Sequence, residues 1–386
     1  MGGGLMQLVA YGAQDIYLTG NPQITFFKVV YRRHTNFSME SIEQTWNGTS
    51  SGSDSRCTAT VSRNGDLVYR MYLEITFGSS HTQTHDNPGA SLINNVELEI
   101  GGQKIDKQSG HWMETWAELT EPNSTGTVAA DSDKDGTLFQ NMSGMGGVFN
   151  NDTFDANDKI FVPLQFWFCR NPGLALPLIA LQYHEVKVIL DHRMLTSVGN
   201  ATNQLWCDYI YLDTDERRRF AQVSHEYLIE QVQEQSMTTS SAGSQDLNFN
   251  HPVKELIWSL STAKVGNTTA SAIGAGTFQL KLNGHDRFAA RDFRYFTRTQ
   301  VWEHHSGAGG LDSGTAAGAG KFDDSIGVYS FALKPEEHQP SGTCNFSRID
   351  NAQMVSTTNT LADTIFAVNY NVLRIMSGMG GLAYSN

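Results

Sequence analysis

The sequence predicts an all-β protein, and three observations carry that prediction. Gly is abundant at 36 residues, Pro is scarce at 9, and only 17% of the residues are charged. Soluble proteins average about 25% charged residues, and this composition suits many short strands joined by tight turns. Apolar and polar residues also alternate along several short segments that end at turn dipeptides. With 386 residues, the chain is long enough for two domains.

Strands are expected wherever this alternation meets a turn signal. Residues 58–77 alternate on both sides of Asn64-Gly65, which supplies the positive φ angles of a type I′ turn, so a β-hairpin is predicted there. Residues 96–100 alternate before a Gly-Gly pair, and residues 278–282 alternate before an Asn-Gly pair. These two segments align without a gap, which suggests an internal duplication.

A second correspondence supports the duplication. Each half has a triplet that begins and ends with an aromatic residue, followed by two prolines and another strand-like run. The members are residues 166–168, Pro172 and Pro177 in the first half, and residues 329–331, Pro335 and Pro340 in the second. Residues 213–222 hold the densest charge run, so the connection between two cores is expected there.

Long loops are expected between the predicted strands, in segments rich in Gly, Ser, Thr, Asn or Ala. Loops of this length in a compact domain usually carry surface function. The segments are 78–89, 121–158, 236–245, 263–276 and 307–320.

The N-terminal residues follow another pattern, because apolar and small side chains fall on one helical stripe. These residues are Leu5, Leu8, Val9, Gly12, Ala13, Ile16 and Tyr17. A short amphipathic helix is predicted, and two interpretations stay open: it packs on its own domain, or it contacts a partner.

Charge argues against a nucleic-acid ligand, because binding to phosphates is driven by Lys and Arg and this chain has a formal charge of -13. The cysteines form no CxxC pair, so neither a zinc site nor a disulfide framework is predicted. We expect Cys57, Cys169, Cys207 and Cys344 to be reduced and mostly buried. The most apolar stretch, residues 160–188, is interrupted by one arginine and two prolines, so no membrane span is predicted.

One acidic segment matches the first half of an EF-hand loop, where alternate carboxylates converge on Ca²⁺. It holds Asp131, Asp133, Asp135 and Gly136, but the twelfth position is Met142 instead of a bidentate Glu. A full EF-hand is therefore excluded. The three aspartates are a candidate cation site, and a solvated acidic loop is the alternative. No cofactor is predicted.

No enzymatic motif has the flanking pattern that its chemistry needs. The G-x-S-x-G match at residues 48–52 lacks the apolar strand and the helix of a nucleophile elbow. His81 with His85, and His304 with His305, are interpreted as surface histidines, because zinc needs three or four convergent ligands. We assign no catalytic residue, and the protein is predicted not to be an enzyme.

Residues 287–298 interleave arginines with aromatics, as a platform for single-stranded nucleic acid would. A half-buried strand gives the same alternation, with its arginines toward water or a neighbouring subunit, and the acidic composition favours this interpretation. Tryptophans are candidates either for subunit contacts or for the core. The four considered are Trp112, Trp116, Trp206 and Trp302. Several N-x-S/T sequons are present, and glycosylation is left open.

Six long segments carry a family resemblance. The chain opens with GGLMQLVAYGAQDIYLTGNPQITFFKVVYRRHTNF at 3–37 and closes with NYNVLRIMSGMGGLAY at 369–384. Between them stand DLVYRMYLEITF at 66–77, VELEIGGQKIDK at 96–107, NPGLALPLIALQYHEVKV at 171–188 and PSGTCNFSRIDNA at 340–352. In this order they resemble the major capsid protein of nucleocytoplasmic large DNA viruses, a family that includes phycodnaviruses and iridoviruses.

The resemblance implies two consecutive eight-stranded jelly-roll β-sandwich domains, a double jelly roll. The expected organisation is an N-terminal arm at 1–24, a first jelly roll at 25–212, a connection at 213–222 and a second jelly roll at 223–386. It also implies a structural subunit whose homotrimers form pseudo-hexagonal capsomers that tile an icosahedral shell.

The partners implied are other copies of the chain, minor capsid and penton proteins, and the inner viral membrane through the arm, with no direct nucleic-acid contact. The implied location is the virion, after assembly in the host cytoplasm. The alternative is a carbohydrate-binding, lectin-like β-sandwich, which predicts glycan affinity from a monomer or small oligomer.

Overall fold

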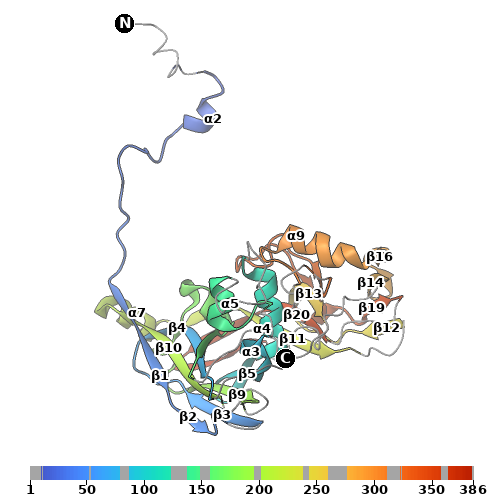
Figure 1. Ribbon diagram of the computed structural model, residues 1–386. Helices are drawn as coiled ribbons and strands as arrows, with labels where there is room; N and C mark the ends of the chain where they lie inside the picture. Colours follow the sequence, from blue (N-terminus) through green and yellow to red (C-terminus); the bar gives the residue numbers. More distant parts are fainter. Residues whose placement is uncertain are drawn as a thin grey trace. The chain divides into compact units, whose positions relative to one another are not determined.

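The computed structural model describes residues 10, 12–51, 54–78, 87–122, 137–147, 157–194, 201–237, 243–259, 276–310, 322, 324–357 and 364–384 (Figure 1). The chain divides into two compact units, Met1–Asn36 and Phe37–Asn386. In the first unit, α2 (Ile16–Thr19) buries no residue. Leu5, Leu8 and Val9 of the predicted N-terminal helix lie outside the described residues.

The first half of the larger unit, here called roll 1, consists of two antiparallel sheets. One sheet has the strand order β1-β10-β4-β7, with β8 paired to β4, and the other has the order β2-β3-β9-β5-β6. The strands are β1 (Phe37–Gln44), β2 (Trp46–Gly48), β3 (Ser55–Thr60), β4 (Leu67–Thr76), β5 (Ile93–Ile100), β6 (Gln103–Ser109), β7 (Lys159–Pro163), β8 (Leu176–Pro177), β9 (Val186–His192) and β10 (Thr202–Leu212).

The second half, roll 2, repeats this arrangement. Its sheets have the orders β11-β20-β13-β17, with β18 on β13 and β21 on β20, and β12-β19-β14-β15, with β16 on β14. The strands are β11 (His225–Ser236), β12 (Gly243–Asp246), β13 (Pro252–Ser259), β14 (Thr277–Leu282), β15 (His285–Asp286), β16 (Arg291–Asp292), β17 (Ile326–Ser330), β18 (Cys344–Asn345), β19 (Ala352–Ser356), β20 (Thr364–Met376) and β21 (Met379–Leu382).

The two rolls have the same strand order, which is that of a jelly roll, so the predicted double jelly-roll fold is confirmed. The register repeats as well. Thr76 ends β4 opposite Thr202 and Lys159, and Ser259 ends β13 opposite Thr364 and Ile326. Residues can therefore be matched one by one between the rolls. The predicted correspondence between segments 96–100 and 278–282 is confirmed, because they form β5 and β14, which occupy the same position in the two rolls.

Two of the three turn dipeptides that adjoin alternating segments form hairpins. Gly101 and Gly102 join β5 to β6, and Asn283 and Gly284 join β14 to β15, all four with positive φ as a type I′ turn requires. The hairpin predicted at Asn64-Gly65 is wrong. β3 pairs with β2 and β9, whereas β4 pairs with β7, β8 and β10, so the chain crosses between sheets there.

The helices lie between strands. They are α3 (Pro88–Ser91), α4 (Gly110–Thr120), α5 (Leu138–Ser143), α6 (Trp167–Arg170), α7 (Thr214–Gln222) and α9 (Gln300–His304), with short turns η1 (Pro172–Leu174), η2 (Tyr295–Thr299) and η3 (Phe346–Arg348). The strand expected along the arginine and aromatic segment is wrong over most of its length, because residues 293–304 form one helical stretch that includes the π-helix η2. Across the described residues, no helix is long and apolar enough to cross a membrane.

The two ends of the larger unit differ. At one end, here called the base end, β3 leads directly to β4 and β5 turns into β6, and α7 connects β10 to β11. At the opposite end, the loop end, the connections between β4 and β5, β6 and β7, β13 and β14, and β15 and β17 are long. The expected long loops lie at this loop end, in part outside the described residues.

Candidate functional site

The junction between the two rolls is built around α4, which connects β6 to β7 (Figure 1). The hydroxyl of Ser109 accepts a hydrogen bond from the backbone N–H of Trp112 and caps the helix. Almost every residue of α4 is buried. Trp112 packs 5.1 Å from Phe366 of β20, and His111 Nε2 lies 2.8 Å from Ser259 Oγ of β13. The helix of roll 1 is therefore part of the packing of roll 2.

A buried ion cluster lies beside this helix. Glu230 of β11 contacts Lys254 Nζ at 2.8 Å, Arg170 of roll 1 at 3.0 Å and His338 Nδ1 at 3.3 Å. Burial alone would raise the pKa of Glu230, but the neighbouring Arg170, His338 and Lys254 outweigh it and lower the pKa to about 2. Arg170 also lies over the Trp116 ring. The cluster thus joins the rolls by charge as well as by packing.

A second ion cluster is centred on His305, whose side chain is fully buried. Its Nε2 lies 2.9 Å from Glu255 of β13 and its Nδ1 lies 3.1 Å from Glu336. Burial alone would lower the pKa of His305, but the two carboxylates raise it to about 9. Both ring nitrogens therefore donate hydrogen bonds, and the ring is an imidazolium at neutral pH. The interpretation of His305 as a surface histidine is wrong, because carboxylates distant in sequence enclose it.

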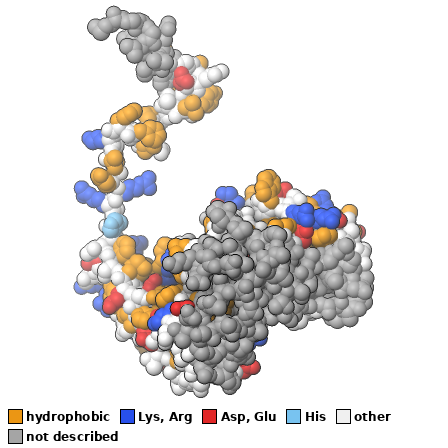
Figure 2. Space-filling model, in the orientation of Figure 1, with side chains coloured by type: hydrophobic (Ala, Val, Ile, Leu, Met, Phe, Trp, Pro, Cys, Tyr) orange, Lys and Arg blue, Asp and Glu red, His pale blue; other side chains and the backbone are white. Residues whose placement is uncertain are grey.

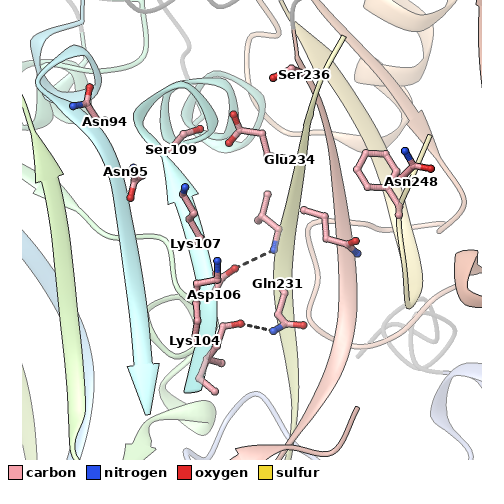
Figure 3. A pocket seen from close by; sticks show the side chains of 14 residues that line it. Asn94, Asn95, Lys104, Asp106, Lys107, Ser109, Gln231, Glu234, Ser236 and Asn248 are labelled. Atoms are coloured by element: carbon pink, nitrogen blue, oxygen red, sulfur yellow. Dashed lines mark hydrogen bonds between the residues drawn. The ribbon is translucent and has the colours of Figure 1, made fainter. Parts of the chain in front are cut away.

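Where β6 and β11 meet edge to edge, side chains replace the backbone ladder (Figure 3). Gln231 donates to the Ile105 carbonyl, and Asp106 Oδ1 accepts from the Val232 N–H at 3.2 Å. A cavity of about 560 Å³ opens beside them, lined largely by polar side chains such as Asn95 and Lys107. Burial raises the pKa of Asp106 to about 6, despite the hydrogen bonds that it accepts.

Asp106 is expected to make the junction more stable as the solution becomes mildly acidic. A carboxyl group with a raised folded-state pKa stabilises the fold as pH falls from about 6 toward the unfolded value of 3.8, because the folded state binds the proton more tightly. Between pH 6.5 and pH 4, the wild type should gain about 2 kcal/mol of unfolding free energy relative to Asp106→Asn. Urea titrations of both proteins at both pH values measure this difference. If the unfolding free energies of the two proteins changed equally between the two pH values, the raised pKa of Asp106 would be contradicted.

The segment Met1–Asn36 exposes large apolar side chains next to cations (Figure 2). Phe26 is 87% exposed and Phe27 is 98% exposed, and Lys28, Arg32 and Arg33 follow them. Within the described residues, this segment buries none of its large apolar side chains. It therefore has the composition of a segment that binds a partner.

The other sequence-predicted residues have varied outcomes. Asp131, Asp133 and Asp135 lie outside the described residues, and the described part of the chain contains no group of three or more ligands that could hold a metal. The cysteines are free, three buried and Cys344 half-buried, as predicted. Of the tryptophans, Trp112 and Trp116 are buried and Trp206 is half-buried, whereas Trp302 is 82% exposed.

Sequence reasoning missed Glu230, Arg170, Lys254 and Asp106, the charged groups of the junction. Charged residues within an otherwise apolar strand are the local signal, as at Lys254 and Glu255 of β13, whose residues are nearly all buried. That signal shows that a partner is needed without showing which residue it is.

Two jelly rolls fused in one chain define the double jelly-roll class of structural proteins. The model of the major capsid protein N-terminus matches residues 25–213, and that of the large eukaryotic DNA virus major capsid protein matches residues 216–381. The chain therefore belongs to the family of major capsid proteins of large eukaryotic DNA viruses. The resemblance seen in the sequence is thereby confirmed.

Relatives span the whole chain. The major capsid protein of Pyramimonas orientalis virus is 52% identical, and that of Paramecium bursaria Chlorella virus 1 is 42% identical, each over 100% of both chains. A quasi-atomic model of the PBCV-1 virus capsid has a TM-score of 0.77 at 37% identity, covering 94% of this chain and all of that one. The Faustovirus major capsid protein shares the fold, with a TM-score of 0.60 at 13% identity, covering 95% of this chain and 94% of that one. The relatives are structural capsid proteins, not enzymes, and the protein is a capsid component of the virion.

Proposed function

We propose that the protein forms homotrimers whose six jelly rolls make a pseudo-hexagonal capsomer, and that these capsomers tile an icosahedral shell. The observation that carries the proposal is the repeated strand order and register of the two rolls. Three copies around a threefold axis then present six blocks of like shape, which pack as a near-hexagon. The relatives' place in the PBCV-1 virus capsid supports this arrangement.

The junction gives the subunit the stiffness that a shell needs. Residues of both rolls share one apolar core, which includes Leu73 and Trp112 of roll 1 with Ile257 and Phe366 of roll 2. Since close-packed cores deform little, each copy behaves as one rigid block.

Particle images of the purified protein test the proposal. We expect threefold-symmetric particles with a near-hexagonal outline and six lobes in electron micrographs. Single jelly-roll pairs without threefold symmetry would contradict it, and glycan binding by such particles would favour the lectin-like alternative.

Further partners follow from the same role. We propose minor capsid and penton proteins as neighbours of the capsomer, and the inner viral membrane or these proteins as partners of the basic, apolar segment Met1–Asn36. Assembly in the host cytoplasm stays a prediction, as does the division of the chain at residues 24, 212 and 222.

A further inference from the structure

Within one chain, roll 1 covers the outer face of a roll 2 sheet. On β13, Trp258 points into the core of roll 2, and its neighbour Ile257 joins the core of roll 1. Phe366 and Val368 of β20 and Val328 of β17 also join the core of roll 1. The helix α4 lies on this face through Trp112 and His111. The chain thus shows how the helix between β6 and β7 of one roll packs on the next roll.

The matching face of roll 1 carries an aromatic cluster. By register, Tyr72, Trp206 and Phe161 take the places of Glu255, Val368 and Val328. The Tyr72 ring stacks on Trp206 with centroids 6.5 Å apart and meets Phe161 edge-on at 6.2 Å. Phe161 is 37% exposed, and Tyr72 and Trp206 are half-buried within the described part of the chain. A cavity of about 700 Å³, lined by Tyr72 and Phe161, opens beside the cluster.

The helix of roll 2 that corresponds to α4 has an exposed face. Residues 293–304 lie between β16 and β17, as α4 lies between β6 and β7. Phe296 is buried in the core of roll 2, and Val301 is buried against the core of roll 1. Arg294, Arg298 and Trp302 follow at intervals of four, so they share one stripe of the helix surface. All three are exposed, with Trp302 at 82%.

We propose that Trp302 of one copy packs against Tyr72, Trp206 and Phe161 of a second copy, so that copies join as the two rolls of one chain do. The inference rests on the proposed trimer and names its contact. Each copy supplies one helix and one aromatic face, so the contact is heterologous, and in the proposed trimer three such contacts close the ring. An exposed tryptophan that fills an aromatic-lined cavity of a second copy is typical of an interface hot spot.

Charge supports this pairing. On the receiving face, Glu43 lies opposite Trp206 in the strand register, and Asp208 follows Trp206 by two residues on the same side of β10. The helix stripe offers Arg294 to these carboxylates, whereas Arg298 already pairs with Asp324 of its own chain. The exposed Arg70 also lines the cavity, and Glu303 next to Trp302 matches its charge. Such complementary patches orient the two copies.

Trp302→Ala tests the contact. We expect the dissociation constant of the trimer to rise about 30-fold or more, the effect of losing a hot-spot tryptophan. The melting temperature of the dissociated subunit should not change, because this side chain contacts mainly solvent in one copy. Tyr183→Ala is the matched control, since Tyr183 is 75% exposed and lies at the base end. A Trp302→Ala trimer within threefold of the wild type would overturn the proposal.

Cross-linking locates the two partners. A Trp302→Cys copy with one affinity tag is mixed with a Phe161→Cys copy that carries another tag, and a short bismaleimide is added. We expect a product that holds both tags, and none when Tyr183→Cys replaces Trp302→Cys. A wild type that is monomeric would overturn the trimer and this contact together. A wild-type trimer without the mixed product would overturn the contact alone, as would Trp302 contacting another capsid protein or a glycan instead.

Discussion

Glu230→Gln is expected to lower the free energy of unfolding by about 3 to 5 kcal/mol, the cost of leaving buried charges without their partner. The Glu230 side chain is 4% exposed, and it neutralises Lys254, at 1% exposure, and Arg170 of the other roll. Glutamine keeps the volume and removes the charge, so packing alone does not explain the loss. Urea denaturation of the purified protein, followed by circular dichroism, measures it.

Glu226→Gln is the matched control, four residues earlier on the same strand. Glu226 pairs with Arg374 at 2.8 Å, but these side chains are 61% and 52% exposed. Surface pairs of this kind contribute less than about 1 kcal/mol. Equal losses for the two variants would show that burial at the junction does not set the strength of the pair.

Between pH 6.5 and pH 9, the protein is expected to lose about 3 kcal/mol of stability through His305 alone. The sign follows from its pKa, which two carboxylates raise to about 9. A group with a raised folded-state pKa contributes fully below its unfolded value of 6.5, and the contribution disappears as pH rises through the folded value. Unfolding free energies measured by urea titration across this range report the loss.

His305→Gln should remove most of this pH dependence and should already be destabilised at pH 6.5, because Glu255 and Glu336 then lose their cation. His285→Gln is the control, since His285 is an exposed residue of β15. An alkaline loss that persists unchanged in His305→Gln would place the titrating group elsewhere.

Local patterns predicted much of the fold. Alternation before a Gly-Gly or Asn-Gly pair located β5 and β14, because both strands pack one face on a core and end in a type I′ turn. The same logic failed at Asn64-Gly65. There Gly65 faces the Tyr209 ring so closely that a side chain would clash, and the chain passes to the other sheet. A dipeptide signals a turn without showing which strands pair.

The junction was much less predictable, since its contacts join residues far apart in the sequence. Arg170 meets Glu230, and His305 meets Glu255, across pairings that only the assembled rolls create. The strand predicted over residues 287–298 was wrong for a related reason. The alternation there fits a strand, but Phe293 and Phe296 are three residues apart and both enter the core of roll 2, as a helix places them.

The oligomeric mass in solution tests the central claim most directly. Light scattering during size exclusion, over a wide range of loading concentrations, should give a constant molar mass near three times the 42.6 kDa of one chain. This result would fit a subunit whose two equivalent rolls complete a six-block ring. A mass of one chain at every concentration would contradict the capsomer.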